Sequence, residues 1–187
     1  MNQLVSLTNH FLIAMPTLAD ANFSRTVTFI CEHTRDGAMG LVINRATDLK
    51  LRDIFDQLTI EASSSVAADM PIYLGGPVQN NRGFVLHEPI GNWDSTLPIT
   101  DTIGVSTSRD ILEAIATDRG PDRWLVALGY AGWGAGQLER ELSENSWLSG
   151  PANAHVLFEI PLEHRWSAAA GAVGVDLTLL SSEAGHA

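Results

Sequence analysis

The pattern of apolar and polar residues predicts short strands along most of the chain. In the segment TVTFICEH (26–33), the apolar residues Val27, Phe29 and Cys31 occupy every second position and would share one face. This spacing is the period of a β-strand. The TRDG sequence at 34–37 is a turn signal, so the residues that follow are expected to return as the second strand of a hairpin. The predicted strands span residues 10–15, 26–33, 38–44, 71–77, 83–89, 123–130 and 155–160.

Helical periodicity predicts three helices between these strands. Before the second helix, Thr107 and Asp110 stand three apart in an N-cap pattern, and Gly120 with Pro121 ends that helix. The Ser- and Ala-rich residues 62–68 are expected to form a loop or the frayed end of the first helix. The apolar faces consist of Leu51, Ile54, Phe55 and Leu58 in the first helix, Ile111, Leu112 and Ile115 in the second, and Leu138 and Leu142 in the third.

The order of strands and helices predicts the fold class. Residues 123–130, RWLVALGY, are too apolar for a strand with one face in water, so a sheet covered on both sides is expected there. Strands and helices alternate without a strict βαβ order. This favours an α/β or α+β domain whose sheet is not purely parallel, and the 187 residues (1–187) fit one such domain.

An internal similarity suggests two related halves. Residues 74–90 resemble residues 148–162, because both contain Leu-x-Gly-Pro followed by Val-Leu-x-Glu. The halves would be about 38–90 and 124–162, related by a pseudo-twofold axis. A groove at their seam would be a natural place for a ligand.

The charge and the single cysteine exclude several classes of protein. The net charge is −11, which disfavours direct binding to nucleic acid because phosphate neutralisation supplies most of that affinity. One cysteine allows neither an internal disulfide nor a multi-cysteine zinc site. No apolar run reaches the ~20 residues of a spanning helix, and no lysine or arginine precedes Arg25, so we expect a cytoplasmic protein without a secretory signal or membrane contact.

A glycine-rich stretch at 127–137 leads from a predicted strand into a predicted helix. Free N–H groups at such a helix start could meet a ligand, with Tyr130, Gly132, Trp133, Gly134 and Gln137 as the candidate binding residues. Gln137 occupies the third glycine position of a dinucleotide fingerprint, and no Walker lysine is near, so neither motif is present. The alternative is that the glycines only let strand and helix pack closely, with the aromatic rings closing over them.

Two histidines and the cysteine are further candidates. His33 and His87 each end a predicted strand beside a glutamate, and adjacent strands would allow a metal site, although solvent-exposed histidines are the commoner outcome. No H-x-H or H-E-x-x-H spacing supports a metal, and no cofactor is predicted. Cys31 is expected to be a small buried hydrophobe; the alternative is a redox-active thiol, with His33 on the same strand face.

Arginine and serine side chains are the remaining candidates for anion binding and catalysis. Arg25, Arg45 and Arg82 could receive a carboxylate or phosphate, but internal ion pairs are more common in so acidic a chain. Ser106 lies in GVSTS rather than in a G-x-S-x-G elbow, so a serine hydrolase is not supported.

Several segments together resemble the AlgH/YqgE family of bacterial proteins. They are HFLIAMP, F-x-R-T-V at 23–27, EHTRDGAMGLVINR, YLGGPV, RGFVLH, LGYAGWGAGQLE-x-E-x-x-N-x-W and the closing GHA. The chain departs from the usual family pattern at Ala46, where proline follows INR, and at Thr26, where serine is common. The resemblance implies a mixed α/β fold with a bifurcated, partly open barrel-like sheet and flanking helices.

The family name comes from a role in regulating alginate synthesis genes, so the resemblance also implies regulation. The acidic charge and the lack of a helix-turn-helix pattern conflict with direct DNA binding. We therefore expect a non-enzymatic regulatory or interaction protein that acts through a protein or small-molecule partner at a groove lined by residues 130–137. The alternative is a small enzyme or binding protein for a phosphorylated or carboxylated metabolite, using His33, Arg82 or His87.

Overall fold

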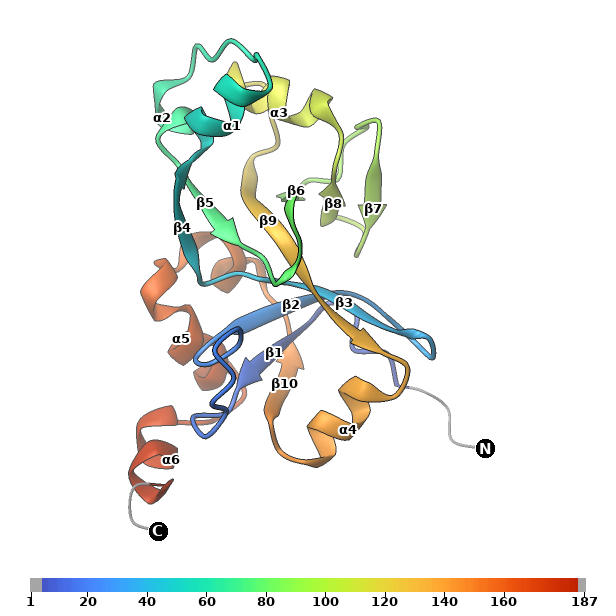
Figure 1. The fold of residues 1–187 in the computed structure, drawn as a ribbon, viewed down its shortest axis with the longest axis vertical. Coiled ribbons are helices and arrows are strands. Elements are labelled where there is room, and N and C mark those ends of the chain that lie inside the picture. Colours follow the sequence, from blue (N-terminus) through green and yellow to red (C-terminus); the bar gives the residue numbers. More distant parts are fainter. Residues whose placement is uncertain (1–4, 185–187) are drawn as a thin grey trace.

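One long strand, β9 (Arg123–Gly134), organises the whole sheet (Figure 1). A computed structural model describes the backbone of residues 5–184 and the side chains of residues 5–180, so the closing GHA motif lies outside the described residues. Within that range the strand order is β10-β1-β2-β3-β9-β6-β8-β7, with β5 on β9 and β4 on β5. The other strands are β1 (His10–Ala14), β2 (Val27–Thr34), β3 (Gly37–Val42), β4 (Ala46–Lys50), β5 (Pro71–Leu74), β6 (Val78–Glu88), β7 (Thr96–Pro98), β8 (Gly104–Ser106) and β10 (Trp147–Pro151).

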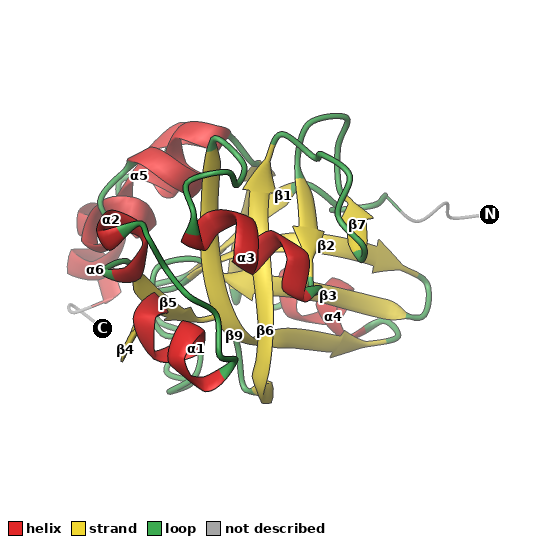
Figure 2. Cartoon of the chain, turned by 90° about the horizontal axis from the view of Figure 1, so that it is seen from above, coloured by secondary structure: helices red, strands yellow, loops and turns green. Residues whose placement is uncertain are grey.

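Helices flank the sheet on more than one side, as Figure 2 shows. None of the helices in the described residues is long and apolar enough to cross a membrane. The mixed α/β class and the split, curled sheet with flanking helices are confirmed. The helices are α1 (Leu51–Gln57), α2 (Ser65–Ala68), α3 (Arg109–Ala116), α4 (Gln137–Ser143), α5 (Arg165–Ala172) and α6 (Leu177–Ala184), with a π-helical turn η1 (His155–Glu159) and a 3₁₀ turn η2 (Leu162–His164).

The sheet splits because β9 changes partners along its length. Its first part pairs with β6 on one side and, at Ala127 and Leu128, with β5 on the other. Its last part pairs with β3. The change occurs at Gly129, where φ is +76° and an added Cβ would lie 2.4 Å from the carbonyl oxygen of Gly76. At Gly76, an added Cβ would lie 2.1 Å from the carbonyl carbon of Tyr130. Only glycine allows the two backbones to approach so closely.

Three apolar clusters fill the two faces of the split sheet. The largest lies inside the curl and includes Phe11, Phe29 and Leu86. A second lies between the sheet and the helices α1 and α3, and a third lies between the sheet and α4. The predicted apolar faces of the helices are buried at Leu51, Phe55, Ile111, Ile115 and Leu138, as expected, whereas Leu58 is 37% exposed.

The C-terminal part of the chain differs most from the expectations. Residues 155–160 were expected as a strand, but His155–Glu159 is a π-helical turn. Asn153 fixes its start by accepting a hydrogen bond from the Val156 amide at 2.9 Å, and Val156 and Leu157 are buried. A short apolar run does not distinguish a strand from a buried helical turn. Because residues 85–88 lie in β6, the two Val-Leu-x-Glu segments differ in structure, and the relation between the two halves stays a prediction.

Two smaller boundaries also differ. The N-cap of α3 is Ser108 rather than Thr107, and the Ser108 hydroxyl donates a hydrogen bond to Asp110 at 2.5 Å. The segment 62–68 contains the separate helix α2, whose start is capped by Ser64 accepting from the Ala67 amide at 3.1 Å. The elements β4, β7, β8, β10, α5 and α6 were not predicted from the sequence.

Alanine at Gly129 tests whether the close backbone approach is required. Gly136 is a matched control, since it also has a positive φ, 75°, but an added Cβ there meets nothing within 4 Å. The left-handed conformation alone costs about 1–2 kcal/mol for alanine. Gly129→Ala adds an overpacking cost of about 1–3 kcal/mol, so its total loss should clearly exceed that of Gly136→Ala in urea unfolding. Equal losses would contradict a steric role for the crossing.

Candidate functional site

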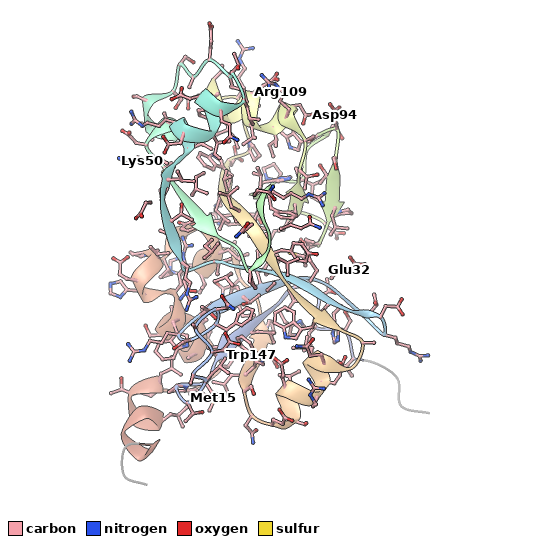
Figure 3. The ribbon with its side chains drawn as sticks, in the orientation of Figure 1. Met15, Glu32, Lys50, Asp94, Arg109 and Trp147 are labelled. Atoms are coloured by element: carbon pink, nitrogen blue, oxygen red, sulfur yellow. The ribbon has the colours of Figure 1, made fainter. Side chains whose placement is uncertain are left out.

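An open cleft of about 610 Å³ lies where β3, β9 and the start of β6 come together. It is the open end of the curl, because Phe84 and Tyr130 belong to or pack against the apolar cluster inside it. Glu32 stands on its β2 side (Figure 3). Its lining includes charged side chains and large apolar or aromatic side chains, among them Glu32, Asp36, Met39, Arg82, Phe84 and Tyr130.

The floor of the cleft is aromatic, and its charges lie at the rim. The rings of Phe84 and Tyr130 meet edge to face, with centroids 5.8 Å apart. The Arg82 guanidinium lies 5.4 Å from the Phe84 centroid and donates to Gln79 Oε1 at 3.3 Å. No ion pair between described residues involves Arg82. The guanidinium therefore keeps donors for a group that enters the cleft.

The glycine-rich stretch is a strand rather than a loop, which corrects the expectation of free amides. β9 runs to Gly134, and residues 131–134 pair with β3. The Gly134 amide donates to Gln137 Oε1 at 3.0 Å, and the Gln137 Nε2 donates to Glu141 at 2.8 Å. Neither Gly134 nor Gln137 lines the cleft, whereas Tyr130, Gly132 and Trp133 do. Of these glycines only Gly129 is closely packed, against Gly76, whereas a Cβ added at Gly132 or Gly134 would make no contact closer than 3.5 Å. Close packing of the strand and helix therefore does not explain the later glycines, and a binding role for the cleft residues stays a prediction.

Most of the Trp133 side chain is buried in the core. It is 5% exposed, its ring meets Trp147 at a centroid distance of 6.1 Å, and its Nε1 donates to Glu141 Oε1 at 3.2 Å. Trp147 Nε1 donates to the same oxygen at 3.0 Å (Trp147 is labelled in Figure 3). One carboxylate therefore holds both indoles beneath α4.

Arg45 is also structural. Its NH1 donates to the carbonyls of Ala21 and Asn22 at 2.8 and 2.7 Å, and its NH2 donates to Ser24 at 2.9 Å. Three carbonyl partners fix the loop between β1 and β2. This places Arg45 away from the cleft and explains it without a bound anion.

His33 is buried, which overturns the expectation of an exposed strand-end histidine. It is 5% exposed, and its Nδ1 accepts a hydrogen bond from the Leu7 amide at 2.9 Å. The proton of the neutral ring must therefore be on Nε2, which donates to Glu139 Oε1 at 2.6 Å. Burial acts to raise the pKa of Glu139, but hydrogen bonds from its own backbone and from His33 outweigh burial and lower it. The pair fastens α4 to β2.

His87 forms a buried pair with Ser106 that the sequence motifs did not reveal. The His87 Nδ1 donates to the Pro89 carbonyl at 2.9 Å, so Nε2 accepts from Ser106 Oγ at 2.7 Å, and Thr96 Oγ1 lies 2.7 Å from that oxygen. Burial lowers the pKa of His87, which keeps the ring neutral. The order of donors is that of a nucleophile and its base, but His87 and Ser106 are both 0% exposed. The network satisfies buried polar groups without reaching the cleft.

The two histidines cannot share a metal. β3 and β9 separate β2 from β6 in the sheet, so His33 and His87 lie far apart in strand order. In the part of the chain that the structure describes, no group of three or more His, Cys, Asp or Glu side chains could hold a metal ion. The condition on which the metal hypothesis rested, adjacent strands, is not met.

Cys31 is a buried hydrophobe, as the first interpretation held. It is 3% exposed, and burial raises the pKa of its thiol strongly, with a further contribution from the charge of Glu32. The register of β2 shifts between Ile30 and Glu32, so His33 faces α4 while Cys31 faces the inner cluster. The expectation that Cys31 and His33 share a face was wrong. The protonated, enclosed thiol is poorly suited to redox sensing.

Known proteins resemble the chain over nearly all of its length. A family model described as AlgH-like matches residues 11–178. A UPF0301 protein of Nitrosococcus oceani is 56% identical over 179 residues, which is 96% of each chain, and one of Thioalkalivibrio sulfidiphilus is 56% identical over 182 residues, 97% of each chain.

Solved structures show the same fold. The solution structure of the AlgH protein from Pseudomonas aeruginosa has a TM-score of 0.80 at 50% identity and covers 100% of both chains. A crystal structure of a Corynebacterium diphtheriae protein has a TM-score of 0.75 at 19% identity, covering 97% of this chain and 94% of that one, which is a likeness of fold alone.

Glu139→Gln tests the fastening of α4 by pH. Because the folded pKa of Glu139 is below its usual 4.5, its stabilising contribution is complete above that pH and is lost as pH falls through the folded pKa. The stability gap between wild type and variant should shrink between pH 7 and pH 3 in urea unfolding. The gap should stay below about 1 kcal/mol, since the side chain is 39% exposed. Glu144→Gln, an exposed control near the end of α4, should show no such trend; a gap for Glu139→Gln that does not change with pH would contradict the assignment.

Proposed function

The chain belongs to the AlgH-like family, and from this premise we propose that it is a non-enzymatic interaction protein whose cleft between β3, β9 and β6 binds a protein partner. Through that partner it acts on gene expression indirectly, in the cytoplasm. The net charge of −11 argues against a direct contact with DNA, because a protein this acidic repels the phosphate backbone.

The composition of the cleft is the observation that carries this proposal. Its floor is formed by Met39, Phe84 and Tyr130, and its rim holds Arg82 together with Glu32 and Asp36. Methionine, aromatic residues and arginine are enriched at the centres of protein interfaces, where they carry most of the binding energy. The rim charges of both signs would select a partner whose own charges are arranged in the complementary order.

The chemistry of the lining also favours binding over catalysis. Within the part of the chain that the structure describes, no histidine, cysteine, serine or lysine lines the cleft. His33 is occupied by Leu7 and Glu139, and His87 is enclosed with Ser106. A general base within reach of a bound substrate would have to be Glu32 or Asp36. The hydroxyl beside them in the lining is that of Thr34, whose Oγ1 accepts a hydrogen bond from the Asp36 amide at 3.1 Å, and none of the described residues that line the cleft is a histidine that could activate it.

A second function, binding of a phosphorylated or carboxylated metabolite, is favoured by one observation. Arg82 has no carboxylate partner among the described residues and lies over an aromatic ring at the rim of the cleft. Such a guanidinium can hold an anionic group in two hydrogen bonds. Nucleotides, phosphosugars and small carboxylates that raise the melting temperature of the wild type but not of Arg82→Ala would support this second function over the first.

Photo-crosslinking from the cleft wall tests the interaction function. A photoreactive residue at Val78, which is 37% exposed and lines the cleft, should give a discrete covalent adduct with one partner in the producing bacterium. Arg82→Glu should reduce that adduct by at least about tenfold, the effect of losing an interface residue worth more than 1.4 kcal/mol. The measurement is the adduct intensity, with the partner identified by mass spectrometry.

Two controls make the outcome decisive. The same photoreactive residue at Leu49, which is 40% exposed on β4 outside the cleft, should not give the adduct. Arg119→Glu makes the same charge change at another exposed arginine and should leave the adduct from Val78 unchanged. An adduct that forms equally from Leu49, or that persists in Arg82→Glu, would rule out the cleft as the binding surface.

A further inference from the structure

A second, narrower hollow lies on the opposite face of β6 from the cleft. Alternate residues of a strand point to opposite faces, and Phe84 lines the cleft whereas Gly83 and Val85 line the hollow. The hollow lies between the helices α1 and α3, which Figure 2 shows above β6 and β9. Its outer part has a volume of about 260 Å³ and its enclosed inner part about 30 Å³.

The two parts adjoin each other. The residues Ile54, Gly83, Thr107, Leu112 and Leu128 line both of them. The inner end is closed by the sheet at Val85 and Val126. The result is a blind hollow that narrows inward, and so limited a volume admits a small molecule rather than a helix or a strand of another protein.

The empty space beside Gly83 is the observation that points to a ligand in this hollow. A Cβ added at Gly83 would meet nothing within 4 Å, and its φ is not in the left-handed range. The glycine is therefore required neither by the backbone conformation nor by a neighbouring side chain, in contrast to Gly76 and Gly129. Yet Val85, two residues along the same face, is only 2% exposed. A glycine within a strand that packs against nothing marks a place where a ligand can approach the backbone closely.

The chemistry of the walls identifies the kind of ligand. The inner walls are mainly aliphatic, with Ile54, Leu112 and Leu128, and the only polar side chains among their described lining residues are the hydroxyls of residues 106–108. The amide side chains Gln57 and Asn81 line the outer part. Among the residues that the structure describes, no acidic side chain lines the hollow, although the chain carries 22 of them, and the one cationic lining residue is Arg109, which is paired with Glu113 outside the lining. An aliphatic interior with a cationic, amide-lined mouth is complementary to a hydrocarbon chain that ends in an anionic group.

Arg109 is held in place at the mouth. It lies at the start of α3, at the same end of the molecule as α1 (Figure 3). Its NH1 donates to the Leu58 carbonyl at 2.6 Å, its NH2 donates to the Thr59 carbonyl at 3.3 Å, and its Nε forms an ion pair with Glu113 at 2.6 Å. These bonds join the C-terminal end of α1 to α3 and fix the width of the opening, while guanidinium N–H groups beyond those engaged can face a carboxylate.

We propose that this hollow binds a medium-chain aliphatic carboxylate. The hydrocarbon chain lies against Gly83 and the aliphatic walls, and the carboxylate lies at the mouth beside Arg109 and Asn81. The site is separate from the cleft and does not depend on what the cleft binds.

Titration with decanoate, followed by NMR of the Ile, Leu and Val methyl groups, tests the proposal. The methyl resonances of Ile54, Leu112 and Leu128 should shift and saturate. Affinity should rise by about fourfold for each CH₂ added from hexanoate to decanoate, because each buried CH₂ contributes about 0.8 kcal/mol. Shifts that do not saturate, or that occur at Val78 of the cleft instead, would overturn the assignment.

Gly83→Val fills the hollow without disturbing the fold. Since the new side chain enters open space in a strand, the melting temperature should stay the same or rise, while decanoate affinity should fall by at least tenfold. Gly171→Ala, which also adds a methyl group where nothing lies within 4 Å, should bind as the wild type does. Undiminished binding by a folded Gly83→Val protein would rule out the hollow.

Charge changes at Asn81 test the position of the carboxylate. Asn81 is exposed at the mouth, so Asn81→Asp should weaken decanoate binding severalfold and Asn81→Lys should strengthen it, with the effect reduced by salt. Arg82→Glu, in the adjacent residue but facing the cleft, should have a smaller effect than Asn81→Asp. If both Asn81 variants bind decanoate as tightly as the wild type, the carboxylate does not lie at this mouth and the proposal fails.

Discussion

The close approach of two backbones at Gly129 and Gly75–Gly76 is the constraint on which the rest of the structure depends. There the connection between β5 and β6 crosses β9 with no room for a Cβ atom, and β9 passes from one set of partners to another. Because the sheet splits at this crossing, one side opens as the cleft, and the other face of β6 is left to be covered by α1 and α3. The cleft and the hollow are therefore two results of the same crossing. Both are bordered by the first residues of β6, whose register against β9 shifts between Val78 and Gly83.

Local periodicity in the sequence was enough to predict those elements whose apolar faces are long and regular. The hairpin of β2 and β3, the covered strand β9 and the helices α1, α3 and α4 bury most of the residues that their periods select, with Leu58 as the exposed exception. The prediction of secondary structure failed where the local sequence is compatible with more than one backbone conformation. Glycines at 132 and 134 suggested a loop, but pairing with β3 keeps them in a strand. Val156 and Leu157 suggested a strand, but hydrogen bonds to Asn153 start a helical turn. In both cases tertiary contacts chose between local alternatives.

The candidate site was predicted less completely, because polar partners are set by pairings distant in sequence. Tyr130, Gly132 and Arg82 do line one cleft, and Trp133 borders it. His33, in contrast, pairs with Glu139, 106 residues away, and Arg45 binds carbonyl groups of the loop at 21–24. No sequence motif predicted the Ser106–His87 pair, because its geometry depends on the register of β6 against β8. No spacing within a segment encodes such contacts; only the strand order does.

The position of β9 late in the chain affects how the protein can be made. During synthesis β3, β5 and β6 all leave the ribosome before the strand that joins them. Until Gly134 has emerged, the nascent chain therefore carries several strands with open edges, and such edges are prone to pair with other chains. A protein in which the last-made central strand closes both parts of the sheet should depend on chaperones that shield strand edges. For the same reason, it should not be divisible into two independently folding fragments on either side of residue 129.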